Sequence, residues 1–228
     1  MLFGLSFFLG PSIWILLPAV ALAIYAQWKV RSTYGRYSRV PSASGFTAQD
    51  AARRLLEAEA VSDVTIEETK RILGDHYDPR KRILRLSGAA STSIAAIGVA
   101  AHEAGHAIQH ARGFGPLALR TAIVPIASFG SQLAFPLFFF GLIFRYPPLL
   151  TVGILLFSAA VLFTLVTLPV EFDASRRAVS ALRTSGLVNT EELGAVKEVL
   201  FAAALTYIAA AAMAALQLLL LLSASRRR

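Results

Sequence analysis

The sequence contains no cysteine, and charged residues make up only 16% of its 228 residues. Without cysteine the chain cannot form a disulfide, and any metal site must be built from histidine and carboxylate ligands. The charge content is well below the quarter or so that is usual in soluble domains. Hydrophobic residues account for 56% of the chain, and the mean hydropathy is +0.60. The composition therefore argues against an ordinary soluble domain and favours a membrane protein.

Long uncharged runs predict where the chain crosses a membrane, because a spanning helix needs roughly 20 mainly apolar residues. Only a short turn at residues 145–148 separates the second run from the third, so these two are expected to form a membrane hairpin. The first run is too long for the apolar core of a cleaved signal peptide, which is the competing interpretation. The fourth is interpreted as a span or as a long helix packed against the others. The runs are Leu5–Trp28, Thr121–Phe144, Leu149–Val170 and the stretch that begins at Leu200.

The formal net charge is +8 at pH 7, and the pI is near 10.3. Nucleic acid is not an expected partner, because no basic patch alternates with aromatic residues. Lys and Arg gather instead in two polar segments, 29–120 and 171–199, whereas the hairpin turn carries only Arg145. Membrane proteins concentrate basic residues in cytoplasmic loops, so both polar segments are predicted to face the cytoplasm. The arginines at 226–228 do not fit this orientation if the last helix spans the membrane.

The polar stretch 29–93 has the pattern of a small folded unit. Thr47 is a suitable N-cap for a helix with apolar residues at helical spacing. Residues 61–68 alternate weakly, and residues 81–87 predict a strand after a turn. The edge of such a strand can pair with an extended peptide, although a strand that only completes a small sheet is an equally good interpretation.

A helix predicted over Ser93–Arg112 contains the sequence His-Glu-x-x-His at residues 102–106. His102 and His106 are four residues apart, so both imidazoles leave one face of the helix and can reach one tetrahedral ion. Glu103 is offset by one position, so it can accept a proton from a water molecule at the metal without being a ligand. Three of the four histidines in the chain lie between residues 102 and 110, which makes a chance match a poor explanation.

Zinc needs a third protein ligand, for which the sequence offers three candidates. His110 lies about 12 Å along the helix axis from His102, too far for one ion. His76 sits at a predicted turn before the strand at 81–87, which makes it a weaker candidate. Glu171 follows directly after the hairpin, which returns the chain to the membrane face that it left, so topology favours this carboxylate. Its alternative role is that of a carboxylate at the start of a helix, where the macrodipole favours negative charge.

Two neighbours of Glu171 have other expected roles. Asp173 is turned about 200° away from Glu171 on a helix, and Arg176 or Arg177 is a sufficient partner for it. Ser175 shares the face of Glu171 and can hydrogen-bond to a metal ligand.

These features predict a mainly α-helical integral membrane protein, with about four membrane helices and a small α+β cytoplasmic unit that carries the His-Glu-x-x-His helix. The chain is divided into five parts. These are a first membrane span (1–28), a polar segment with a small sheet and the zinc-binding helix (29–120), a membrane hairpin (121–170), a third-ligand helix with a polar loop (171–199), and a C-terminal membrane helix with a basic tail (200–228).

Four stretches in this order resemble the YugP-type membrane zinc metallopeptidases of bacteria: 75–87, 93–111, 167–178 and 203–212. The resemblance implies Zn²⁺ at His102 and His106, Glu103 as the catalytic base, and Glu171 as a ligand, as in the gluzincin class. The chain is also similar, more distantly, to membrane proteases of the HtpX type. Those carry Glu-x-x-x-Asp at the third ligand, whereas Ser175 stands here in place of the Asp, so the orientation of the ligands needs another explanation.

The sequence therefore predicts a zinc-dependent peptidase in the cell membrane of a bacterium, with its active site at the cytoplasmic face. Its expected partners are protein or peptide substrates and the lipid bilayer, and analogy suggests a role in membrane-protein quality control. His76, Tyr207 and Arg176 are candidate donors to the oxyanion. The alternative is a catalytically silent zinc-binding scaffold, against which the intact Glu103 argues. No oligomeric state is predicted.

Overall fold

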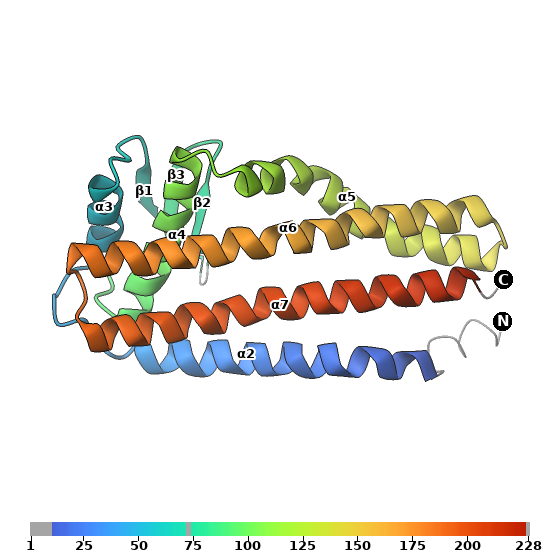
Figure 1. Ribbon diagram of the computed structural model, residues 1–228, viewed down its shortest axis with the longest axis horizontal. Helices are drawn as coiled ribbons and strands as arrows, with labels where there is room; N and C mark the ends of the chain where they lie inside the picture. The colour runs from blue at the N-terminus through green and yellow to red at the C-terminus, as the bar shows by residue number, and fades with distance from the viewer. Residues whose placement is uncertain (1–10, 72–73, 227–228) are drawn as a thin grey trace. The chain divides into compact units, whose positions relative to one another are not determined.

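The computed structural model describes residues 11–71 and 74–226 (Figure 1). Long helices dominate it, and a three-stranded sheet lies between the third and fourth helical elements in the sequence. The elements in chain order are η1 (Pro11–Leu16), α2 (Leu17–Tyr37), α3 (Ala48–Ala58), β1 (Thr65–Glu68), β2 (His76–Asp78), β3 (Ile83–Leu86), α4 (Ile94–Ala111), α5 (Gly115–Ile143), α6 (Pro147–Ser185) and α7 (Thr190–Arg226).

The chain divides into two compact units. One, here called the helical unit, comprises Met1–Ala26, Leu119–Leu168 and Thr206–Arg228. The other, called the mixed unit, comprises Gln27–Ala118 and Pro169–Leu205, and it contains α3, α4 and all three strands.

Three helices of the described part are long and apolar enough to cross a membrane, judged by length and composition. They are α5, α6, and α7 over residues 190–225. A fourth span stays a prediction, because the first ten residues of the expected run at 1–28 lie outside the described residues, and the remainder belongs to η1 and α2.

The third-ligand helix expected at 171–199 is not a separate element. Instead α6 continues without interruption from Pro147 to Ser185, and α7 begins at Thr190 after a short turn. Glu171 therefore lies in the interior of a 39-residue helix. The alternative role of Glu171 as a helix-start carboxylate is wrong, because the first turn of α6 is at Pro147.

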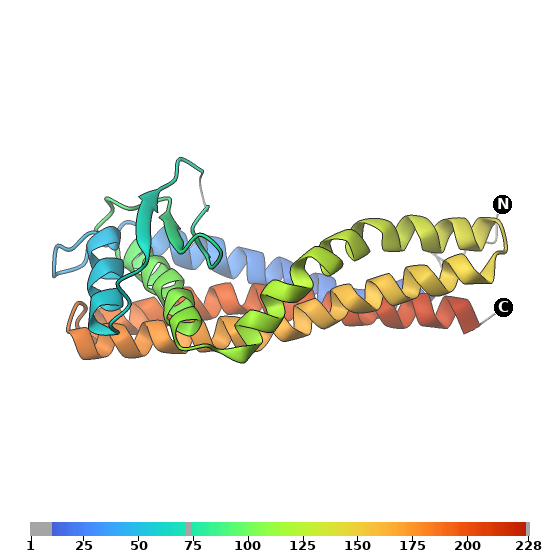
Figure 2. The ribbon, with the colours of Figure 1, turned by 90° about the horizontal axis from the view of Figure 1, so that it is seen from above.

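The sheet of the mixed unit has the strand order β1-β3-β2, with β1 parallel and β2 antiparallel to β3. The expected strand at 81–87 corresponds to β3, in which Leu84 and Leu86 are buried and alternate with more exposed residues, as a one-sided sheet requires. His76 was expected at a turn, but it begins β2 and pairs with Arg85 of β3. Figure 2 shows the strands beside α3 and α4.

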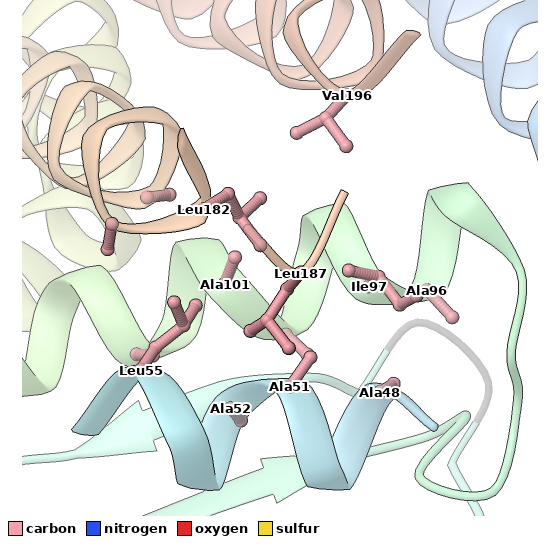
Figure 3. Packing of buried hydrophobic residues seen from close by; sticks show 14 of the residues in the cluster. Ala48, Ala51, Ala52, Leu55, Ala96, Ile97, Ala101, Leu182, Leu187 and Val196 are labelled. Carbon is pink, nitrogen blue, oxygen red and sulfur yellow. The ribbon is translucent and has the colours of Figure 1, made fainter. Parts of the chain in front are cut away.

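The core of the mixed unit combines alanines on facing helices with larger aliphatic residues. Thr47 caps α3 as expected: its side chain accepts from the backbone of Asp50, which bonds back to the Thr47 N–H. The buried face of α3 then packs on α4, and Leu182 of α6 and Val196 of α7 close the other side of α4 (Figure 3). Alanines predominate in this core, so the helix backbones can approach closely and hold side chains in fixed positions.

Candidate metal centre

The His-Glu-x-x-His sequence lies inside α4, a helix with defined ends. Ser93 is the N-cap, and its Oγ accepts a hydrogen bond from the Ala96 N–H at 3.2 Å. After Ala111, Gly113 adopts a positive φ of 63°, a conformation that glycine tolerates best and that ends the helix. The metal-binding candidates thus stand on a rigid element rather than on a loop.

Three side chains from α4 and α6 come together within the mixed unit. His102, His106 and Glu171 each offer one ligand atom, and these atoms all lie within 4.8 Å of one another. Oε2 of Glu171 is 3.1 Å from Nε2 of His102 and 3.7 Å from Nε2 of His106. The carboxylate is only 3% exposed. Two ring nitrogens and one carboxylate oxygen therefore converge on a common point.

This donor set fits zinc. Catalytic zinc sites use three protein ligands of the imidazole and carboxylate type and leave a fourth position for water or substrate. The chain has no thiolate to offer, and within the described ranges the group is the one set of three or more histidine and acidic side chains that can hold a metal ion.

The electrostatics of the group also favour a cation. Burial by itself lowers the pKa of His106, but the nearby carboxylates of Glu171 and Glu103 outweigh burial, so the pKa is raised. Glu103 is itself buried and follows His102 directly in α4. The surroundings that stabilise a protonated imidazole would stabilise a bound dication in the same way.

The two histidines that were weaker candidates for the third ligand make hydrogen bonds to other residues. Nδ1 of His110 is 2.9 Å from the hydroxyl of Tyr77 on β2. Nδ1 of His76 is 2.8 Å from the Gly74 carbonyl oxygen, and its Nε2 is 3.3 Å from the Arg85 guanidinium. Neither belongs to the group of three.

A second layer of hydrogen bonds holds the far side of each imidazole. Nδ1 of His102 is 3.1 Å from Oγ of Ser175, the contact that the sequence suggested. Nδ1 of His106 is 3.0 Å from Oε1 of Gln109. Gln109 was missed in the sequence, although its position three residues after His106 places the two side chains as neighbours on one helix face.

Asp173 has one more partner than expected. Its carboxylate binds Arg176 and Arg177, as predicted, and it also accepts from Nε2 of Gln109 at 2.9 Å. Nε2 of Gln109 donates in addition to the Val170 carbonyl oxygen at 2.8 Å. A carboxylate is thus present at position 173 rather than at 175. It is connected to the candidate ligand His106 through hydrogen bonds of Gln109.

The groups suggested as oxyanion donors lie on three different elements. Arg176 of α6 binds Asp173, and its side chain is 77% exposed. His76 lies on β2 and Tyr207 on α7, the latter in the helical unit. The role of any of them toward an oxyanion stays a prediction.

Gly105 allows α4 and α6 to approach at the centre. A Cβ atom at this position would lie 2.5 Å from the carbonyl oxygen of Ala174 on α6, and backbone atoms cannot yield as a side chain can. The neighbours of Gly105 and Ala174 in sequence include the candidate ligand His106 and Ser175, the hydrogen-bond partner of His102. The spacing of the candidate ligands therefore depends on this contact between backbones.

Substituting Gly105→Ala is expected to lower both thermal stability and zinc affinity, with a stability loss of about 1–3 kcal/mol or more from overpacking. Gly98→Ala is the matched control on the same helix, because a Cβ there meets only the Val196 side chain, at 3.3 Å. Alanine favours a helix by roughly 1 kcal/mol over glycine, so Gly98→Ala should be close to neutral. Thermal unfolding and zinc titration of both variants measure the difference, and equal behaviour of the two would contradict it.

Comparison with known proteins identifies the family of the chain. The profile of a family described as "Putative neutral zinc metallopeptidase" matches residues 12–226. The chain is 44% identical over 209 residues to the "Putative membrane protease YugP" of Bacillus subtilis (strain 168), covering 91% of this chain and 93% of that protein. No solved structure matches. The match to the family profile spans nearly the whole chain, and the candidate centre offers donors that suit zinc. The chain therefore belongs to this family of zinc metallopeptidases, and its cofactor is zinc.

Proposed function

We propose that the chain is a membrane-embedded zinc peptidase that hydrolyses peptide bonds of protein substrates near the cytoplasmic face of a bacterial cell membrane. The observation that carries the proposal is the convergence of His102, His106 and Glu171, with the buried carboxylate of Glu103 next to the first of them. The family supports this proposal, because its description names both zinc and a peptidase.

His102, His106 and Glu171 hold the metal in this proposal, and Glu103 is the general base. Bound zinc would supply Lewis-acid chemistry, which polarises a carbonyl oxygen and makes water more acidic. The Glu103 carboxylate accepts a proton from the attacking water and then delivers it to the nitrogen of the leaving amine. Burial suits this role, because a carboxylate shielded from bulk water exchanges its proton with the reacting atoms rather than with solvent.

The proposed place of action rests on three observations. Three helices have the length and composition of membrane spans, the relative from Bacillus subtilis is named a membrane protease, and basic residues gather in the segments that carry the centre. Such a basic bias is typical of cytoplasmic segments. A peptidase beside the bilayer would reach membrane proteins, so their quality control is the proposed cellular role.

Removing the metal tests the proposal. The full-length protein in detergent, incubated with casein and with solubilised membrane proteins, should lose cleavage to background when 1,10-phenanthroline is added and regain it with zinc. The isomer 1,7-phenanthroline, which does not chelate, is the matched control. Cleavage that survives chelation would contradict a zinc peptidase.

The second candidate is a zinc-binding scaffold without activity. A scaffold would bind zinc stoichiometrically but would cleave no substrate, before or after metal exchange. The buried Glu103 argues against it, because a scaffold needs the three ligands but has no use for a carboxylate beside them.

A further inference from the structure

Gln109 has an unusual environment for an amide. Its side chain is fully buried, with 0% exposure, and both ends of the amide are engaged. Oε1 lies 3.0 Å from Nδ1 of His106. Nε2 donates to the carbonyl oxygen of Val170 at 2.8 Å and to the Asp173 carboxylate at 2.9 Å.

These contacts fix which way the amide points. A backbone carbonyl and a carboxylate only accept hydrogen bonds, so the group that faces Val170 and Asp173 must be the NH₂ of Gln109. Arg176 and Arg177 bind the same carboxylate, which keeps it an acceptor. A flipped amide would set its oxygen against two other oxygens and is excluded.

The orientation of Gln109 in turn fixes the tautomer of His106. The amide oxygen that faces Nδ1 only accepts, so Nδ1 of His106 must carry the proton. The lone pair of the neutral ring is then on Nε2, the atom that faces Glu171 in the group of three. His106 is therefore presented in the form in which Nε2 can bind a metal.

The partner of His102 imposes no such constraint. Ser175 contacts Nδ1 of His102 at 3.1 Å, but a hydroxyl can donate or accept, so this contact is compatible with either tautomer. The two imidazoles are thus held differently, one by a partner that only accepts and one by a partner that adapts.

We infer that Gln109, anchored by Asp173, is a positioning residue for the metal centre. It fixes His106 on α4 in its metal-binding tautomer and ties that histidine to the backbone of Val170, the residue before Glu171 on α6. One amide thereby fixes the position of His106 relative to Glu171, although the two residues lie on different helices. The inference rests on the proposed function only in taking His106 as a zinc ligand.

The first test is the zinc affinity of full-length Gln109→Leu, measured by competition with a chelator of known affinity. Loss of a residue that hydrogen-bonds to a metal ligand typically weakens metal binding by roughly 10–100-fold, and a loss of this size is expected here. Gln49→Leu is the matched control, since it makes the same change at a half-buried glutamine on α3 in the same unit, and it should bind zinc like the wild type.

The second test is the tautomer itself, which a purely structural role would not change. In metal-free protein labelled with ¹⁵N-histidine, at a pH where His106 is neutral, the wild type should show the Nδ1–H form at His106. Gln109→Leu should shift this residue toward the Nε2–H form and leave His110 unchanged. The chain has only four histidines, so single His→Ala variants assign the signals.

A pair of variants that exchanges donor and acceptor tests the inference even if Gln109→Leu does not fold. Gln109→Glu keeps the acceptor for His106 but sets a carboxylate against Asp173, and zinc affinity should fall. Adding Asp173→Asn supplies an NH₂ that can donate to the new carboxylate, and it should recover part of the loss. Absence of any recovery would overturn the inference.

The inference would also be overturned if Gln109→Leu bound zinc as tightly as Gln49→Leu with the tautomer of His106 unchanged. Failure of the proposed function alone would abolish cleavage and leave these effects on zinc binding intact, whereas a different result is expected if His106 is not a zinc ligand. In that case His106→Ala would bind zinc as well as the wild type does, and the Gln109 variants would have no metal affinity to change.

Discussion

Peptide cleavage by the Glu103→Gln variant is expected to fall by about 10²–10⁴-fold, the usual contribution of a general base, while zinc stays bound. Glutamine has the size of glutamate but cannot take up the proton of the attacking water. Glu103 is next to a ligand without being one of the three converging side chains, so the metal should be retained. The measurements are kcat/KM on a cleaved peptide and the zinc content of the purified protein.

Glu57→Gln is the matched control for this variant. Glu57 is an exposed glutamate on α3 of the same unit, and replacing it should leave both the rate and the metal content unchanged. If Glu103→Gln cleaved as fast as Glu57→Gln, Glu103 would not be the base. If it lost its zinc as well, Glu103 would belong to the binding site instead.

Zinc binding is expected to collapse in the Glu171→Ala variant. One of three protein ligands is removed, so the loss of affinity should exceed the roughly 10–100-fold that follows from losing a partner behind a ligand. The substitution also leaves two imidazoles without the nearby carboxylate whose oxygen lies 3.1 and 3.7 Å from them. Zinc content after dialysis and a competition titration measure the effect, and activity should disappear in parallel.

His76→Ala is the comparison for Glu171→Ala. His76 was considered as the third ligand, but its ring binds Gly74 and Arg85, so its removal should leave the zinc content unchanged. Full retention of zinc in Glu171→Ala, or loss of zinc in His76→Ala, would assign the third ligand differently.

The sequence predicted the convergence of ligands because two simple geometric rules apply to them. Helical spacing puts His102 and His106 on one face, and a hairpin of two spans returns the chain to the side of the membrane where it began. No comparable rule pointed to Gln109, because its role depends on atoms of α6 that only the packing of two helices brings near. Its spacing from His106 was a local signal, but uncharged glutamines on helices are common and carry no specific meaning.

Other differences have similar physical causes. β2 has only three residues, too few for an alternating pattern, and it is a strand because β3 pairs with it. The boundary expected at Glu171 marked a change from apolar to polar residues. A helix continues through such a change when its hydrogen bonds and packing continue, and α6 does so as far as Ser185.

The division of the centre between α4 and α6 has a consequence for the order in which the protein is made. The ribosome adds α4 first, then the whole of α5 and much of α6, and only then Glu171. A growing chain therefore holds two of the three converging side chains throughout the synthesis of the intervening hairpin. The full set of candidate ligands is therefore available only late in synthesis, and an incompletely made chain lacks side chains that the proposed activity requires.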